Sequence, residues 1–244
     1  SRARCTALLG ACLLATCLTG GVRAAEGTWS GSSEVTIVSD HLWRGFKLAD
    51  ASIQPSLTGV YSDKFSIGVW GSYAVEDGDN GKYNETDFLA SYTLNQDAYS
   101  VTLGGTVYRA DNLRDPNTGA PFDSYFESFV SMTFKHKLSP TVTFWREYGR
   151  LSTNYIEVSI NPTLNLNEKT RVSFRPYVGF FENSNDYYGA DVALNRDFEK
   201  GFYGRVSVTL IKSSFVASAS APASPPVTAG NPGPRSPHLP DVPL

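Results

Sequence analysis

Apolar and polar residues alternate along most of the chain, from about Glu34 to Lys212, in stretches of about 8–14 residues. The clearest stretch is Tyr155–Leu166, where Ile156 and Val158 flank Glu157 and the same alternation continues to the end. Successive side chains of a β-strand point to opposite faces, so this period of two predicts strands. No window shows a 3.6-residue apolar stripe, and the pattern therefore predicts an all-β chain.

Eleven strands are predicted, and each is bounded by Gly, Pro, Asn, Asp or Ser. Their ranges are 33–47, 52–62, 64–75, 84–94, 98–109, 123–138, 141–148, 154–166, 169–181, 187–197 and 201–212. Long and short connections alternate strictly, which is typical of an antiparallel meander with tight turns at one end and longer loops at the other. Bacterial single-chain barrels have an even number of strands. We therefore expect twelve strands, the last from Ser213–Ala219, with ten as the alternative.

Two architectures fit alternating strands in an exported protein. A soluble sandwich buries its apolar faces between two sheets, whereas a membrane barrel turns them outward to lipid and keeps its polar faces inside. Aromatic residues gather near strand ends, as in a membrane girdle, at Tyr61, Tyr73, Tyr99, Phe126 and Phe202. The predicted strands also match the roughly 9–11 residues of a tilted membrane crossing. The pattern therefore predicts an antiparallel up-and-down transmembrane β-barrel over residues 26–215.

The two ends of the chain depart from this pattern. Residues 1–25 are predicted to be a secretory signal peptide, with Arg2 and Arg4 at the start, an apolar middle and small residues for cleavage near Ala24 and Ala25. All 3 cysteines lie in this segment, so the mature chain is expected to carry no disulfide or thiol chemistry. Residues 216–244 are rich in Ala, Ser and Pro and are predicted to be a disordered tail.

Composition narrows the possible functions. The chain has 21 basic and 24 acidic residues and a formal net charge of -3, which does not favour nucleic acid as a partner. Its 3 histidines are scattered, and no cysteine follows the expected signal, so neither a metal site nor a catalytic triad is predicted. We therefore expect no enzyme activity, no metal and no cofactor.

Charged residues on the polar faces are the candidates for a lumen that selects solutes. Asp40 and Arg44 lie four apart in the first predicted strand and are expected to share a face, either as a selectivity element or as an internal ion pair. The other candidates, expected to line one wall, are Glu147, Glu157, Arg171, Arg175, Asp191 and Arg205. Buried charges need pairing or water, so this network could line an open channel or plug a closed one.

Two motifs resemble those of a known family. Ser39-Asp40-His41-Leu42-Trp43-Arg44-Gly45-Phe46 resembles the opening Ser-Asp-Tyr-x-x-Arg-Gly of the bacterial TorF-like porins, with His41 in place of Tyr. Gly68-Val69-Trp70-Gly71-Ser72 resembles the following Gly-x-Trp-Gly-Ser of the same family. The resemblance covers about residues 26–212 and implies an outer-membrane barrel with a transport role. It names no solute and brings no catalytic residues.

The pattern and the resemblance together predict a porin-like channel for passive passage of small solutes or ions in the bacterial outer membrane. Its expected partners are outer-membrane lipid, these solutes and, during biogenesis, the barrel-insertion machinery. The alternatives are a plugged barrel with a structural or binding role and a soluble exported β-sandwich that binds a ligand.

Overall fold

The computed structural model describes residues 8–18, 27–75, 83–111, 124–149, 152–182, 186–199 and 202–213. The chain is all-β. Its strands are β1 (Leu8–Leu18), β2 (Trp29–Val38), β3 (His41–Trp43), β4 (Phe46–Ala49), β5 (Ser52–Tyr61), β6 (Phe65–Ala74), β7 (Asn84–Asn95), β8 (Tyr99–Ala110), β9 (Ser124–Phe134), β10 (Thr141–Tyr148), β11 (Asn154–Ser159), β12 (Thr163–Asn165), β13 (Thr170–Phe181), β14 (Tyr187–Asp197) and β15 (Phe202–Ser213). Within these ranges, no helix has the length and hydrophobicity of a membrane span.

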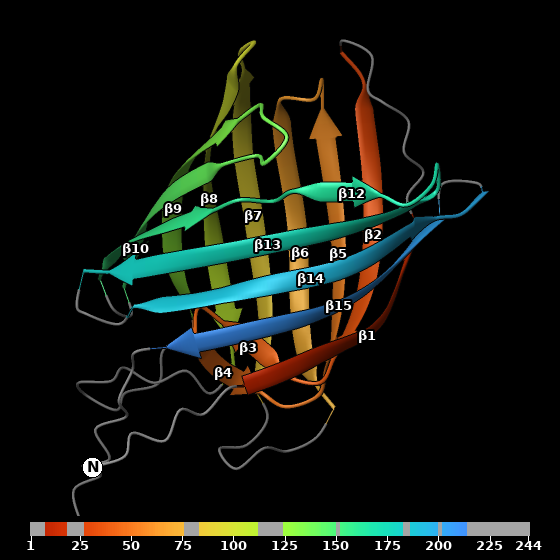
Figure 1. The fold of residues 1–244 in the computed structure, drawn as a ribbon. Helices are drawn as coiled ribbons and strands as arrows, with labels where there is room; N and C mark the ends of the chain where they lie inside the picture. The colour runs from red at the N-terminus through yellow and green to blue at the C-terminus, as the bar shows by residue number, and fades with distance from the viewer. Residues whose placement is uncertain are drawn as a thin grey trace, which may run out of the picture.

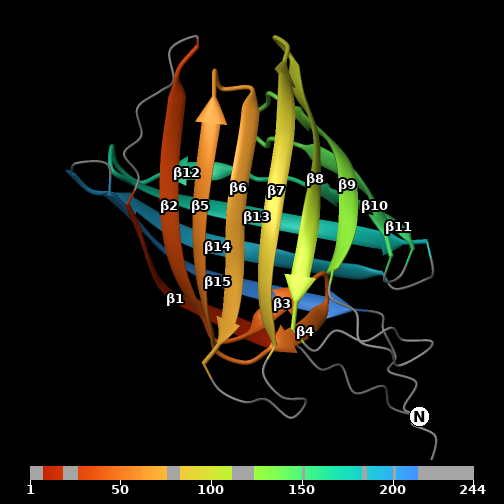
Figure 2. The ribbon, with the colours of Figure 1, turned by 180° about the vertical axis from the view of Figure 1, so that it is seen from behind.

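The strands form one antiparallel up-and-down sheet in the order β11-β10-β9-β8-β7-β6-β5-β2-β1-β15-β14-β13-β12. A further antiparallel pairing joins β11 to β13. Figure 1 shows β13, β14, β15 and β1 crossing in front of β2, β5, β6 and β7, and Figure 2 shows the same two layers from behind. The sheet therefore curves around an interior.

β11 and β12 are two parts of one strand. Both pair with β13, and the register is the same before and after the break, from Ser159 opposite Tyr177 to Thr163 opposite Ser173. The break lies around Pro162, which has no N–H to donate to the ladder. The sheet therefore has twelve strands, as expected.

Most predicted strands are confirmed, and two expectations are wrong. From 52–62 to 201–212 the predicted ranges coincide with β5 to β15, mostly within a residue at each end. The first predicted strand, 33–47, ends at Val38, because the chain bends at Ser39 and Asp40 and then forms the separate β3–β4 pair. The twelfth strand of the described sheet is β1, which lies between β2 and β15 inside the expected signal segment. Of the expected strand Ser213–Ala219, Ser213 is the last residue of β15 and the rest lies outside the described residues. Residues 214–244, with the expected tail, lie outside the described residues.

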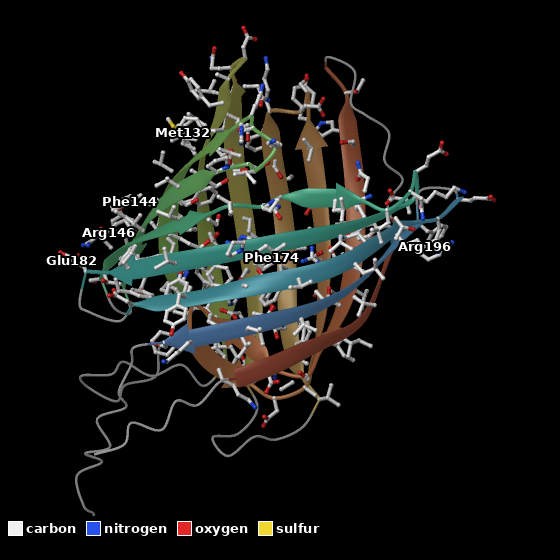
Figure 3. The ribbon with its side chains drawn as sticks, in the orientation of Figure 1. Met132, Phe144, Arg146, Phe174, Glu182 and Arg196 are labelled. Carbon is white, nitrogen blue, oxygen red and sulfur yellow. The ribbon has the colours of Figure 1, made fainter. Side chains whose placement is uncertain are left out.

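The sheet exposes its apolar face and buries its polar face, which is the opposite of a sheet in a soluble protein. Apolar side chains on the outer face are exposed, as for Leu57, which is 59% exposed. Met132, Phe144 and Phe174 likewise point away from the interior in Figure 3. Polar and charged side chains face inward instead, and the inward-facing carboxylate of Glu127 is only 1% exposed. The apolar rows therefore do not meet across a dry interior, as a β-sandwich would require.

Candidate functional site

The connection from β2 to β5 folds into the interior as a short hairpin, β3–β4 (Figures 1 and 2). Its two turn residues, Arg44 and Gly45, have φ angles of 47° and 89°. Two successive positive φ angles give the tight turn whose twist suits a hairpin, and glycine adopts this conformation without strain. A Cβ added to Gly45 would lie 2.9 Å from Cβ of Ser213 and 3.2 Å from Cβ of Tyr187. The turn therefore rests against β14 and β15, and the hairpin crosses the interior.

Arg44 anchors the hairpin to the opposite wall. Its Nη1 and Nη2 atoms donate to Oε1 and Oε2 of Glu127 at 2.7 and 2.9 Å. The hydroxyls of Tyr108 and Tyr155 also donate to Oε2, at 2.8 and 2.9 Å. Bidentate, charge-assisted bonds of this kind are among the strongest that a protein makes. They compensate the burial of both charges, since the Arg44 and Glu127 side chains are only 12% and 1% exposed.

Aromatic rings enclose the same guanidinium group. The Arg44 Cζ lies 3.9 Å from the ring centre of Tyr155, 4.2 Å from that of Trp43 and 5.3 Å from that of Trp145. Cations are attracted to aromatic faces at these distances, most strongly when water is excluded. Leu42 and Phe46 of the hairpin pack on an inward-facing apolar cluster, whose members are Tyr155, Tyr177, Phe181, Tyr187 and Ile211. The hairpin therefore supplies much of the packed core inside the sheet.

Cavities lie on both sides of the hairpin. One, of about 430 Å³, is bounded by the hairpin and the wall from β5 to β8, and the other, of about 230 Å³, by the hairpin and the wall from β11 to β15. Leu42 and Arg44 line both, so the hairpin separates them. A third cavity of about 310 Å³ shares Trp70 and Leu89 with the first and continues along the wall from β5 to β9.

The larger cavity has an acidic wall. Glu85 and Asp87 of β7 are 3% and 7% exposed, and Oδ1 of Asp87 has no hydrogen-bond partner among the described residues. The Nε2 atom of His41 lies 3.8 Å from Oε2 of Glu85, and its ring contacts Trp70 at 5.5 Å. Burial lowers the pKa of His41 to about 4. The imidazole is therefore neutral at pH 7 and does not balance the carboxylates.

Asp40 and Arg44 do not share the face of one strand, and that prediction is wrong. Asp40 lies at the bend before the hairpin, where its Oδ1 is 2.5 Å from Nζ of Lys47. The same Nζ lies 2.6 Å from Oδ1 of Asp50. Hydrogen bonds to these two carboxylates raise the pKa of Lys47, so the base of the hairpin is held by a cation between two acids. Arg44, in contrast, reaches into the interior.

Three of the predicted wall residues form one cluster on the other side of the hairpin. Arg175 of β13 pairs with Glu157 of β11, and its Nη1 donates to Oδ2 of Asp191 at 3.1 Å. The hydroxyls of Tyr187 and Thr209 donate to Glu157 and Asp191, each at 2.8 Å. Arg175 and Asp191 lie directly opposite each other in the register, so the pairing follows from the strand alignment.

The remaining predicted wall residues lie elsewhere. Arg171 pairs with Asp197 at 2.5 Å, with both side chains about half exposed. Glu147 is buried on β10, directly opposite Glu127 in the register. Arg205 is exposed on β15. The predicted single wall is therefore assembled only around Arg175.

Sequence reasoning missed the centre of the site. Glu127, Tyr108 and Tyr155 lie on three different strands, and only the inward parity of each position marks them before the fold is known. Only half of the turn carried a signal, because glycine at Gly45 suits the second position of a two-residue hairpin, whereas Arg44 is not among the residues that usually occupy the first.

No family model and no curated protein matches this chain. The resemblance to TorF-like porins therefore stays a prediction that rests on two motifs. Within the described residues, no group of three or more His, Cys, Asp or Glu side chains is arranged to hold a metal ion. Function is accordingly argued from the polarity of the sheet and the geometry of its interior.

Proposed function

We propose that the protein is a closed twelve-stranded β-barrel of the bacterial outer membrane and a narrow channel for passive passage of small solutes or ions. Because β1 (Leu8–Leu18) is its twelfth strand, this proposal keeps β1 in the mature chain in place of the expected cleavage near Ala24 and Ala25. The observation that carries this proposal is the inverted polarity of the sheet, with apolar side chains exposed outside and charged ones buried inside. Water penalises such an outer surface, whereas hydrocarbon favours it. Outer-membrane lipid is thus its proposed environment, which it enters through the barrel-insertion machinery.

The distribution of outward charges supports a membrane-spanning band. Charged residues at outward positions of the described strands are confined to the last few residues of a strand, at Arg109, Arg146, Arg196 and Lys212. Arg146 and Arg196 lie at opposite ends of the sheet in Figure 3. Both lie over aromatic rings, at 5.6 Å from Tyr148 and 5.8 Å from Phe198. Long basic side chains beside aromatic rings are typical of the two membrane interfaces.

The strand pairings support closure. β13 pairs with both β11 and β14, so each of the twelve strands has a neighbour on either side. Hydrocarbon offers no hydrogen bonds to a free strand edge, which is why only closed sheets span a membrane. The tight turns around Asp63 and Gln96 lie at the end of the sheet opposite the β3–β4 hairpin. By analogy with outer-membrane barrels, we place the tight turns in the periplasm and the hairpin at the outer end.

The proposed path follows one wall of the lumen. The cavities of about 430 and 310 Å³ share the lining residues Trp70 and Leu89 and follow one another from the hairpin toward the tight-turn end. Cavities of this size on either side of the hairpin suit small solutes. Rings of charged side chains at a constriction are a common basis of ion selectivity.

A plugged barrel is the second candidate, and the bond from Arg44 to Glu127 across the lumen favours it. In that case the hairpin is a permanent brace, and the barrel serves a structural or binding role. Breaking the bond distinguishes the two, since it changes the conductance of a channel but only the stability of a brace.

Conductance in a planar bilayer tests the channel directly. The chain is extracted in detergent and first checked for a heat-dependent shift in gel mobility, which reports a closed barrel. We expect discrete conductance steps from the folded form and none from the heated form. A silent bilayer with fully folded protein would exclude the channel and leave the plugged barrel. Folded protein that stays in solution without detergent would exclude both.

A further inference from the structure

We propose that the larger lumen cavity binds a small organic cation of the alkylammonium class, so that the channel prefers cationic solutes. The preference for cationic solutes rests on the proposed channel, whereas binding itself requires only that the cavity can be reached from one end of the barrel. The cavity, of about 430 Å³, lies within the range of roughly 300–1,000 Å³ that is usual for small-molecule sites.

An unpartnered carboxylate oxygen points to a positively charged ligand. Asp87 is 7% exposed and lines the cavity, and its Oδ1 has no hydrogen-bond partner in the part of the chain that the structure describes. A buried carboxyl group without a partner is costly, and an ammonium group in the cavity would donate a hydrogen bond to it and favour its charged form. Glu85, which is 3% exposed, lines the same cavity two residues away on the same face of β7. Two positions along a strand separate the two Cα atoms by about 6–7 Å.

The cations beside this cavity are engaged elsewhere. Both Nη atoms of Arg44 donate to Glu127, and Nζ of Lys47 is held between Asp40 and a second carboxylate at the base of the hairpin. His41 is buried and neutral at pH 7. Among the described residues that line the cavity, the acidic side chains of Asp40, Glu85 and Asp87 therefore outnumber the one basic side chain of Arg44.

The remaining lining favours an organic cation over a metal ion. The rings of Trp43, Trp70 and Tyr108 border the cavity, and aromatic faces attract alkylammonium groups. A bare ion would fill only a small part of this space. The described residues also offer no cluster of three or more His, Cys, Asp or Glu side chains that could hold a metal. Two carboxylates beside aromatic rings suit an alkyl chain with one or two ammonium groups.

Calorimetric titration of the folded full-length protein in detergent tests the site with 1,4-diaminobutane as the probe. We expect saturable binding that Asp87→Asn weakens by about tenfold or more, since one charge-assisted contact is lost. Asn has nearly the same size and shape as Asp and keeps an acceptor oxygen, so the variant should fold. Asp63→Asn is the matched control, because Asp63 is an exposed turn residue with φ of 55°, a conformation that Asn also tolerates. Glu85→Gln should weaken binding in the same direction.

Three results would overturn the inference. The first is an absence of saturable binding by protein that shows the full heat-dependent gel shift. The second is equal affinity of the wild type and Asp87→Asn. The third is displacement of the probe by millimolar Mg²⁺ but not by tetramethylammonium, which would identify an inorganic cation site. Because binding in detergent requires no conductance, a silent bilayer refutes the channel and leaves this result independent.

Discussion

Removal of the Arg44 side chain should destabilise the folded protein strongly. In Arg44→Ala the Glu127 carboxylate stays buried on β9 at 1% exposure and loses both of its bonds to the guanidinium group. The hydroxyls of Tyr108 and Tyr155 still donate to it, so the charge is not wholly unsolvated. The hairpin also loses the group that ties it to the opposite wall.

The size of the effect follows from the burial of the pair. Breaking a buried ion pair by removing one partner costs about 3–5 kcal/mol. Because the two hydroxyls remain, we expect the lower end of this range for Arg44→Ala, about 3 kcal/mol or roughly a hundredfold in the unfolding equilibrium. Glu127→Gln keeps the shape and the acceptor oxygen but not the charge. Glu127→Gln alone should therefore destabilise the protein less than Arg44→Ala does. In the double variant it should offset part of the destabilisation caused by Arg44→Ala.

Urea unfolding of the protein refolded in detergent or lipid vesicles measures these changes, with tryptophan fluorescence and the heat-dependent gel shift as two probes. The double variant should be more stable than the sum of the single effects predicts, by about 1–3 kcal/mol, because the residues are in direct contact. Arg205→Ala is the control, since Arg205 is exposed and its loss should change stability by no more than about 0.5 kcal/mol. Additive effects, or an Arg44→Ala loss equal to that of the control, would refute the proposed anchor.

Three further predictions test the environment, the pH response and the second charge cluster. Leu57 lies in the middle of the outer face of β5, so Leu57→Arg should lower the free energy of unfolding in lipid by about 2–4 kcal/mol. Phe65→Arg, at a strand end, should lower it by only about 0–1 kcal/mol. Equal effects of the two variants on unfolding in vesicles would count against a membrane-spanning band. Burial lowers the pKa of His41 from 6.5 to about 4, so the unfolded chain binds a proton at this residue more tightly than the folded chain does. Above pH 6.5 the neutral imidazole therefore costs the folded protein no stability, and stability is lost as the pH falls from 6.5 to about 4. The free energy of unfolding should fall by roughly 3 kcal/mol over this range in the wild type and should not show this fall in His41→Gln. Urea unfolding of both proteins at several pH values measures the difference. Arg175→Ala should lower the free energy of unfolding by about 1–2 kcal/mol, after allowance for the 36% exposure of this side chain, and by more than Arg171→Ala, whose ion pair is about half exposed. In an open channel, Arg175→Ala should also shift the reversal potential toward cation selectivity. A loss of stability without such a shift would favour the plugged barrel.

The strand order was predictable because each strand carries its own period-two pattern. From β5 to β15 the alternation and the turn residues fixed both the bounds and the inward face, so the pair of Arg175 and Asp191 follows from register alone. The prediction failed where the alternation continued through a change of direction. Leu42, Arg44 and Phe46 alternate with other residues as a strand would, yet the chain turns at Arg44 and Gly45, where both φ angles are positive.

The twelfth strand was missed for a different reason. Leu8–Leu18 is an uninterrupted apolar and small-residue run without charge, which fits the middle of a signal peptide and also a strand. Periodicity cannot separate the two. Pairing with both β2 and β15 is a property of the folded sheet, and no local pattern in the segment records it.

The partner of Arg44 could not be predicted, because nothing in the sequence ranks one inward carboxylate above another. Glu85, Asp87, Glu127, Glu147 and Glu157 all occupy inward positions and are all largely buried. What selects Glu127 is the depth to which the hairpin reaches, and that depth is set by the contact of Gly45 with β14 and β15. The same geometry explains why Asp87 keeps an oxygen without a partner. The hairpin carries its two cations to Glu127 and to its own base, and neither of them pairs with Asp87.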